Sequence, residues 1–536
     1  MLSVNDFIAR KPVLYGSILL SSLLIFRKLL VKFLSPRKLP LPPGPKGLPL
    51  LGNVSDLPPP GVPEWRHWLK FKDLYGPISS ITIFGQTIIV IHDREIVSEL
   101  LEKRSAKFSE RPHMRFASDL CGYGRMMGFE GNNVNHRTQR KFAAKQMGSK
   151  TSVKKYHSAI EFQVQRFLYR TMETPKDRIS HIQFEAGSFI LANIYGYNTN
   201  PIGSDPLIDL INEMMVGFSE ATIAGAWPVD LFPWFEYIPE WFPGVQFKRF
   251  AREHKKILTQ ATDTPYAFTK QMMSQGTANQ SYVQGLLTGE RSPSEIANIK
   301  RSALSLYGGG ADTTVANLEF FFLAMSLFPE VQRKAQEEID RVIGADAMRL
   351  PGFEDRDNLP YIEAVLKEAL RWFPIAPLGL PHSTDEEDVF HGYRIPKGSI
   401  IMPSLGWFSR DPTRYPEPDR FNPDRFLGPN PQEDPHTFVF GFGRRICPGR
   451  QLADSNLYLM IAQTLAVFDI KRNTDLDART EIELTQGQTP GTISHPTPFE
   501  CTITPRTQAH RDLIVRVHAA NPDEEGDAAS LQALEV

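Results

Sequence analysis

The chain of 536 residues has a formal net charge of −1, because 60 lysines and arginines face 61 aspartates and glutamates. This balance argues against a nucleic-acid partner, which would require a basic face, and it favours a neutral or hydrophobic ligand. Composition offers no point at which to divide the chain, so we expect one large domain with terminal appendages. The chain has three cysteines, Cys121, Cys447 and Cys501, which show no CxxC spacing. This pattern argues against a zinc site or a disulfide and favours a reducing compartment.

Residues 1–38 are expected to form a membrane anchor and its basic flank. Residues 13–26 are uncharged and mostly apolar, and Arg27, Lys28 and Lys32 interrupt the apolar residues that follow. The uncharged run is shorter than the roughly 20 residues that a bilayer core requires, so the span must extend into the next turns while the basic side chains snorkel. A cleaved signal peptide is the alternative, but no small-residue cleavage pattern follows. By the positive-inside rule, the rest of the chain lies in the cytosol.

The next segments are a proline-rich hinge over residues 39–53, a catalytic domain over 54–508 and a polar, acidic tail over 509–536 that we expect to be disordered. The hinge is expected to act as a stiff spacer, because its prolines lack N–H donors. Residues 78–91 alternate as a β-hairpin. A helix capped by Asp93 should follow.

Residues 108–131 are expected to form a long irregular loop, followed by a helix that begins near His136. Residues 152–301 are expected to be mainly helical, with a break at Pro201 and another at the aromatic and proline run 227–243. Because aromatic side chains so clustered are unlikely to face water, this run either covers a cavity, touches a bilayer or does both. The sequence leaves these alternatives open.

A long buried helix is expected over residues 302–328, although Gly308, Gly309 and Gly310 lie in its middle. Each such glycine costs about 1 kcal/mol relative to alanine, so three together need a compensating reason. Close approach of a bulky planar cofactor is one, and a helix opened locally by Thr313 is another. Asp312 beside Thr313 forms a proton-delivery pair, whereas the alternative is a flexible kink with a polar patch.

Glu368 and Arg371 lie three residues apart on a helix that opens near Tyr361, so they share a face and can pair. Such pairs are usually exposed and contribute little. Leucines and aromatic residues around this pair indicate burial, where an ion pair requires further hydrogen bonds. The segment 423–426 supplies a second arginine, Arg425.

A glycine-rich loop over residues 440–449 leads into a helix, with Cys447 where loop becomes helix. The helix dipole and unpaired N–H groups at this position favour a thiolate, which is a strong metal ligand. Phe440 is expected to shield the sulfur from water, and the glycines let the backbone approach a flat cofactor. An isolated cysteine is more often a small buried hydrophobe, so this interpretation depends on the flanking pattern.

Four segments, in this order, resemble motifs of the cytochrome P450 family. Gly309–Thr314 resembles its oxygen-handling motif, Glu368–Arg371 its Glu-x-x-Arg motif, and Phe440–Gly449 its haem-binding loop at every fixed position. Pro423–Phe426 resembles a further motif, with Asp424 in place of the family's glutamate. The sequence near Trp234 and over residues 499–506 most resembles that of filamentous-fungal members of the O-methylsterigmatocystin-oxidoreductase-like group, which act on secondary metabolites.

The resemblance implies a mainly α fold with small β-sheets (α+β), preceded by an N-terminal transmembrane helix. It implies that Cys447 is the axial ligand of haem b, that Asp312 and Thr313 form a proton relay, and that Glu368, Arg371 and Arg425 form a structural lock. The residues implied to hold the haem or to neutralise its propionates are Arg140, His382, Phe440, Gly443, Arg445 and Gly449. His136 stands where the family usually has tryptophan, which leaves its role as a propionate donor in doubt.

The implied function is monooxygenation of a hydrophobic small molecule at the endoplasmic reticulum membrane, with a cytosolic catalytic domain. Electrons would come from NADPH through NADPH–cytochrome P450 reductase, with cytochrome b5 as a further donor. The rivals are a haem-thiolate isomerase or dehydratase, which needs no reductase, and a non-catalytic haem gas sensor. The segments implied to face the substrate are mainly apolar, which favours a multi-ring or prenyl-derived metabolite, and Glu220 is the acid that could select an amine or indole N–H.

Overall fold

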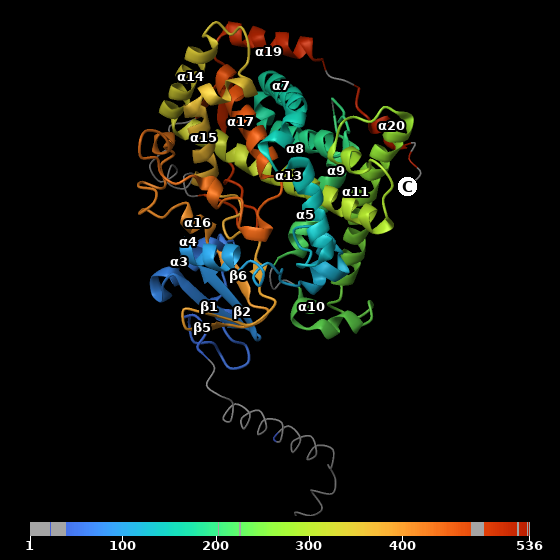
Figure 1. The fold of residues 1–536 in the computed structure, drawn as a ribbon, viewed down its shortest axis with the longest axis vertical. Helices are drawn as coiled ribbons and strands as arrows, with labels where there is room; N and C mark the ends of the chain where they lie inside the picture. Colours follow the sequence, from blue (N-terminus) through green and yellow to red (C-terminus); the bar gives the residue numbers. More distant parts are fainter. Residues whose placement is uncertain are drawn as a thin grey trace, which may run out of the picture.

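The computed structural model describes Ser22 and residues 39–534, apart from 60, 202, 224–226, 473–486, 523–524 and 533. The expected anchor over residues 1–38 therefore lies outside the described residues, with the exception of Ser22. Helices form most of the molecule, and the largest sheet lies at one end of it, near the start of the described chain (Figure 1). The expectation of a mainly α fold with small sheets is confirmed.

The α-helices follow one another along the whole described chain. They are α3 Glu64–Tyr75, α4 Arg94–Val97, α5 Val134–Met147, α6 Lys150–Val153, α7 His157–Glu173, α8 Arg178–Tyr195, α9 Pro206–Ala221, α10 Pro228–Leu231, α11 Phe247–Gln275, α12 Tyr282–Leu286, α13 Pro293–Leu327, α14 Pro329–Ile343, α15 Pro360–Trp372, α16 Leu405–Phe408, α17 Arg450–Val467, α19 Gln508–Ala520 and α20 Ala528–Gln532.

The described strands form one four-stranded sheet, in the order β1-β2-β6-β3, and two hairpin-like pairs, β4-β5 and β7-β8. In the larger sheet β2 and β6 are parallel, whereas β1 and β3 are antiparallel to their neighbours. The strands are β1 Ile78–Ile83, β2 Gln86–Ile91, β3 His382–Ser383, β4 Asp388–Phe390, β5 Tyr393–Ile395, β6 Ile400–Pro403, β7 Phe468–Arg472 and β8 Cys501–Pro505.

The expected hairpin and the helix after it are both present. Strands β1 and β2 pair from Ile78 with Ile91 to Ile83 with Gln86, so Phe84 and Gly85 form the turn. The Asp93 carboxylate accepts a hydrogen bond of 2.8 Å from the Ile96 N–H at the start of α4. The chain then continues as a π-helix, η2, over Ser98–Lys103.

The long helix α13 runs through the middle of the helical region and packs against α8, α5 and α11 (Figure 1). It begins earlier than expected, because Ser292 and Glu295 form a capping box and Pro293 occupies its first turn. It is helical throughout Gly308–Thr314, so the structure shows no local opening there. Its residues from Thr314 to Ser326 are buried and form the centre of the main hydrophobic core.

Two appendages and one loop differ from expectation. The proline-rich segment does not stand free of the domain, because Pro43 O accepts from Ser80 N–H on β1 and Pro40 O accepts from Arg394 N–H on β5. The loop 108–131 contains a π-helix, η3 Arg115–Leu120, and a short 3-10 turn, η4 Tyr123–Arg125.

The carboxy-terminal segment expected to be disordered contains two helices. Leu513 and Ile514 of α19 are buried against the core, because a few apolar residues at helical spacing suffice to dock an otherwise polar helix. Further along, Asp527 exchanges hydrogen bonds with the backbone of Asn198, which ties the segment before α20 to the end of α8.

Among the described residues, no single helix has both the length and the apolar character of a membrane span. Of these described helices, only the pair α13 and α14 together has the length and composition of a span, and the two helices are bent by 101° relative to each other.

Candidate functional site

Cys447 lies in the turn that leads into α17. Its N–H donates to Phe440 O at 2.7 Å, which closes the loop on itself. Arg140 on α5 donates from Nη1 to Ile446 O at 2.6 Å, so a helix far away in sequence holds the residue beside the cysteine. The sulfur is thus positioned by backbone contacts from two elements.

The thiol does not ionise readily in this environment by itself. Burial raises the pKa of Cys447, and the Gly449 N–H, the Arg140 guanidinium and Arg450 oppose this effect without cancelling it. As expected, the N–H groups at the helix terminus favour the thiolate. Burial outweighs them, however, so the net pKa of Cys447 is raised rather than lowered. A bound metal cation would supply the missing stabilisation of the thiolate.

Glycine at position 443 is required by the protein backbone. Gly443 has φ +52°, and a Cβ at this position would lie 2.1 Å from Leu101 O of η2. At Gly449, by contrast, the nearest atom to an added Cβ would be Cys447 Sγ at 4.0 Å. Gly449 thus leaves space beside the sulfur, and the half-buried Phe440 ring, stacked on His436 at a centroid distance of 5.7 Å, borders the same loop.

Three guanidinium groups, from Arg111, Arg140 and Arg445, gather near this loop. Arg445 donates to Ser109 O at 2.7 Å and Glu130 O at 2.8 Å, whereas Arg111 donates to Gly128 O and to Leu380 O and Pro381 O. Burial lowers the pKa of each group, to about 10 for Arg445. Repulsion from the neighbouring arginines adds to this effect at Arg111 and Arg445, where the Glu110 carboxylate opposes it.

Within the described residues, none of these three groups forms an ion pair with a carboxylate. Their positive charge is therefore available for an anionic ligand, since a buried carboxylate requires charged hydrogen-bond donors. The sequence analysis did not find Arg111. The sequence around Arg111 gives little indication of a binding role, because this arginine is a single charge in an irregular loop without periodicity.

The role of His382 at a haem propionate stays a prediction, and in this structure the ring carries no charge. His382 is buried on β3, and its Nδ1 lies 2.8 Å from Phe108 O, to which it donates. Burial and the nearby Arg111 lower its pKa to about 3, so the ring is neutral and its Nε2 can only accept. His136 is also neutral, with a pKa lowered to about 3 by burial and then by Arg445, and its buried Nδ1 has no hydrogen-bond partner.

The glycines of α13 serve different purposes. A Cβ on Gly310 would lie 2.3 Å from Ile190 Cδ1, so this glycine permits close packing with α8. A Cβ on Gly309 would meet nothing within 4 Å, and Gly309 is exposed although it lies in the middle of a core helix. Thr313 Oγ1 donates to Gly309 O at 2.7 Å, which places the hydroxyl at the edge of this open space. Asp312 also has access to open space, with 36% of its side chain exposed.

These features fit a haem. The space beside Cys447 and Gly449, the exposed Gly309 within the core and the three arginines without carboxylate partners supply a thiolate ligand, room for a flat ring and donors for two propionates. The orphaned Nδ1 of His136 is a further unused polar atom in the same region.

The structure brings Glu368, Arg371 and Arg425 together. Arg371 Nε donates to Glu368 Oε2 at 2.7 Å, and Arg425 Nε donates to Glu368 Oε1 at 3.1 Å. The Asn422 N–H donates to the same Oε1 at 2.7 Å. The group joins α15 to the 416–425 segment. Among the described residues, none of its hydrogen bonds involves Cys447.

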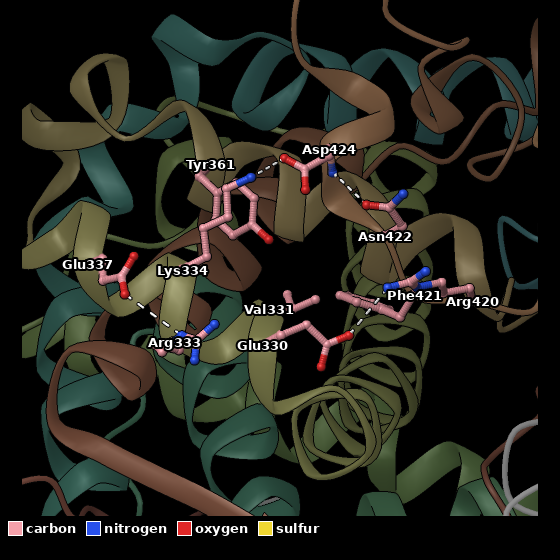
Figure 2. Close-up of a pocket in the computed structure, with 10 residues that line it drawn as sticks. All are labelled: Glu330, Val331, Arg333, Lys334, Glu337, Tyr361, Arg420, Phe421, Asn422 and Asp424. Atoms are coloured by element: carbon pink, nitrogen blue, oxygen red, sulfur yellow. Dashed lines mark hydrogen bonds and ion pairs between the residues drawn. The ribbon is translucent and has the colours of Figure 1, made fainter.

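A surface pocket of about 220 Å³ lies just outside this group, between α14 and residues 420–424 (Figure 2). Figure 2 shows it bordered by ion pairs, among them Lys334 with Asp424 and Arg420 with Glu330. It shares no lining residue with α13 or with the loop around Cys447. We therefore assign the functional site to the space between α13 and Cys447.

Comparisons with known proteins agree with this geometry. Residues 42–501 match the family model described as Cytochrome P450. The chain is 45% identical to the cytochrome P450 monooxygenase ppsD of Aspergillus oryzae and 43% identical to the cytochrome P450 monooxygenase CLM2 of Gibberella zeae, over 92% of this chain and 94% of each relative. It is 38% identical to the O-methylsterigmatocystin oxidoreductase of Aspergillus flavus, over 97% of this chain and 98% of that protein.

The family model and these relatives cover the catalytic domain almost completely, and the site contains the cysteine and the open helix face that the haem requires. The chain therefore belongs to the cytochrome P450 family, and it is a haem-thiolate monooxygenase.

Proposed function

We propose that the protein inserts one atom of dioxygen into a largely apolar metabolite, by hydroxylation, epoxidation or successive oxidations, in fungal secondary metabolism. The observations that carry the proposal are the open position at Gly309 in the middle of a core helix and the room that Gly449 leaves beside the Cys447 sulfur. The segments that we expect to border the space between them are mainly apolar. The names of its fungal relatives support the pathway class, since one of them acts on O-methylsterigmatocystin.

The residues that would hold haem b are Cys447 at the iron, Arg140 and Arg445 together with Arg111 at the propionates, and the backbone of Phe440, Gly443 and Gly449 along the loop. When bound, this group would supply the activation of dioxygen with electrons from a redox partner.

Asp312 and Thr313 are the proposed proton relay. Thr313 Oγ1 donates to the carbonyl of Gly309, so it can accept a hydrogen bond while it keeps that contact. Its neighbour Thr314 donates in the same manner to Gly310 O at 2.7 Å but is buried. Only the first of the two hydroxyls therefore lies beside the open space.

Segments far apart in sequence meet around this space. Ser305 Oγ on α13 accepts from Met127 N–H, Tyr123 OH donates to Met214 O on α9, and Ser494 N–H donates to Ile375 O. Glu220 lies on the exposed face of α9. The mainly apolar residues of these segments favour a substrate selected by shape and apolar surface rather than by charge.

NADPH–cytochrome P450 reductase is the proposed electron donor, with cytochrome b5 as a second one. Arg137, Lys141 and Lys145 form an exposed stripe at four-residue spacing on α5, and Arg444 beside the Cys447 loop is exposed as well. In the part of the chain that the structure describes, none of these four forms an ion pair. An acidic partner domain could dock here by electrostatic complementarity.

The endoplasmic reticulum membrane is the proposed location, with residues 1–38 as a single-pass anchor. The described chain starts at the same end of the molecule as α10 (Figure 1), and Trp234, Tyr237 and Trp241 near α10 are 58%, 80% and 81% exposed. Phe232 contacts Phe84 of the β1–β2 turn at a centroid distance of 6.0 Å, which extends this aromatic surface toward the start of the chain. Aromatic side chains are favoured at the membrane interface. Deleting residues 1–38 should release much of the protein from microsomes, and a full-length chain found soluble or secreted would refute the anchor.

Reductase-dependent turnover tests the function. With reductase and NADPH, the full-length protein should consume NADPH and dioxygen and convert a compound in extracts of a strain that lacks this gene. An isomerase or dehydratase would convert its compound without NADPH, and a gas sensor would bind carbon monoxide without any turnover. Mass spectrometry with labelled dioxygen should find one labelled oxygen atom in the product.

A further inference from the structure

His495 joins two carboxylates of α13. Its Nε2 lies 3.3 Å from Asp312 Oδ1, and its Nδ1 lies 2.8 Å from Glu319 Oε2. Asp312 and Glu319 are separated by seven residues, which is about two turns of an α-helix, so they lie on the same face. One imidazole ring therefore spans both carboxylates along the helix.

The backbone around His495 is held in place. Its N–H donates to Thr489 Oγ1 at 2.9 Å, and its carbonyl accepts from Thr489 N–H at 2.8 Å. The preceding Ser494 donates to Ile375 O at 2.8 Å, and Gly491 N–H on the same segment donates to Glu64. The ring position is thus set by contacts to several elements rather than by its own flexible side chain.

The three side chains differ in exposure. Glu319 is 11% exposed, His495 28% and Asp312 36%. Asp312 is also three residues from Gly309, whose face of α13 is open. The buried Glu319 can therefore act as an anchor for the ring, while Asp312 is the most exposed of the three and lies one helical turn from the open position at Gly309.

We propose that His495 is the positioning residue of the proton relay, in that its imidazolium, anchored to Glu319, sets the orientation of the Asp312 carboxylate. This inference rests on the relay role of Asp312 proposed above. His495 touches neither the space beside Cys447 nor, in any recorded contact, Thr313, so it acts through Asp312. A doubly protonated imidazole donates from both nitrogens, which is the state that two carboxylates favour.

The charge of the ring predicts a pH dependence. Burial alone would lower the pKa of His495, but the hydrogen bonds to Asp312 and Glu319 and their charges outweigh it and raise the pKa to about 9. Asp312 and Glu319 on α13 are the charged groups that contact the ring among the described residues. Glu64 of α3 binds the same segment at the Gly491 N–H, and Glu500 follows further along it. The positioning should therefore persist at neutral pH and fail as the pH rises through about 9.

Two variants separate the two contacts of the ring. The amide nitrogen of glutamine takes approximately the place of Nε2, so His495→Gln retains a donor toward Asp312, whereas the shorter His495→Asn retains one only toward Glu319. In the full-length holoprotein with reductase, hydrogen peroxide released per NADPH oxidised should rise several-fold in His495→Asn and less in His495→Gln. His510→Gln is the matched control, because His510 is a buried histidine on α19, away from α13, and it should leave the ratio unchanged.

Two further readouts distinguish positioning from a general structural role. In the wild type the peroxide ratio should increase above about pH 9, whereas in His495→Gln it should not change there. Without turnover, the thermal unfolding midpoint of His495→Asn should lie below that of the wild type at pH 7 and approach it at pH 10. If His495→Asn does not yield folded holoprotein, Glu319→Gln takes its place, because it removes the charge that anchors the ring, and it too should raise the peroxide ratio more than His495→Gln.

A double-mutant cycle decides the inference. If His495 acts through Asp312, adding His495→Asn to Asp312→Asn should raise the peroxide ratio no further than Asp312→Asn alone. An effect of Asp312→Asn without any effect of the His495 variants, or additive effects, would overturn the inference and leave the proposed function intact. No effect of Asp312→Asn would refute the relay itself, and the inference with it.

Discussion

The guanidinium of Arg371 forms two hydrogen bonds with the carboxylate of Glu368, at 2.7 and 2.9 Å, and both side chains are fully buried. Arg425 binds the same carboxylate, with 2% of its side chain exposed. One negative charge thus faces two positive charges in the core. The carbonyl oxygens of Ser409 and Pro416 accept from Nη1 of the two arginines, and further carbonyls accept from Nη2 of Arg425. Such a group is tolerated only while every member is present.

Removing the carboxylate charge should therefore destabilise the fold. We expect Glu368→Gln to lower the free energy of unfolding by about 3–5 kcal/mol, because it leaves two buried guanidiniums without a counter-charge. The yield of holoprotein and its chemical unfolding midpoint measure this. Glu240→Gln is the control, since its pair with Arg252 is exposed on both sides and should contribute less than about 1 kcal/mol. Equal losses in the two variants would contradict the structural lock.

Replacing Cys447, the proposed metal ligand, should change the spectrum of the haem. We expect Cys447→His to lose the red-shifted carbon monoxide band of the ferrous thiolate complex, with or without retention of haem. Cys121→Ser and Cys501→Ser should retain the band, because Cys121 is fully buried in the core and Cys501 is paired with Arg178. A band that depends on either of these cysteines would show that the ligand is assigned wrongly.

Two neighbouring threonines allow a matched test of the relay. Thr313 and Thr314 each donate to a carbonyl four residues earlier at 2.7 Å, but only Thr313 lies at the open face of α13. Thr313→Ala should retain haem and raise the hydrogen peroxide released per NADPH oxidised several-fold, because proton delivery is impaired. Thr314→Ala should lower stability slightly without a change in this ratio. The same ratio in both variants would favour a helix kink with no role in proton transfer.

Charge reversal on α5 should weaken the reductase complex. In Lys141→Glu we expect the KM for reductase to rise several-fold while the spectrum of the haem is unchanged, because rim charges mainly affect association. The difference from the wild type should shrink at high salt, where exposed charges are screened. Lys256→Glu, on the exposed face of α11, is the control. A KM equally sensitive to both positions would exclude a specific docking surface.

A second histidine between two carboxylates should make stability depend on pH. His436 contacts Asp434 at 2.7 Å and Asp454 at 3.1 Å, and although burial opposes it, these contacts raise its pKa to about 9. A raised pKa stabilises the fold fully below the ordinary value near 6.5, and this contribution is lost as the pH rises through about 9. The unfolding midpoint of His436→Gln should therefore lie below that of the wild type at pH 6 and approach it above pH 9. A difference that is independent of pH would refute the charged state of His436.

Local patterns in the sequence were sufficient to predict the elements and motifs that depend on residues close to one another in the chain. The hairpin over 78–91, the cap at Asp93 and the helix around Gly309–Thr314 follow from residues within a few positions of one another. The loop at Cys447 could be recognised for the same reason, since its fixed positions lie within one short segment.

Contacts between distant segments could be decided only by the tertiary structure. Arg111 is held by the carbonyls of Leu380 and Pro381, which are distant from it in sequence. Asp312 is likewise paired with the distant His495. No pattern in the sequence around either residue indicates its partner. The neutral state of His382 follows from burial beside Arg111, and the order of α19 follows from the core surface it covers. Charge states and docked helices depend on what surrounds a residue in space. The sequence by itself therefore determined the loop motif at Cys447 and the chemistry that it predicts, whereas only the fold decided which groups surround that loop.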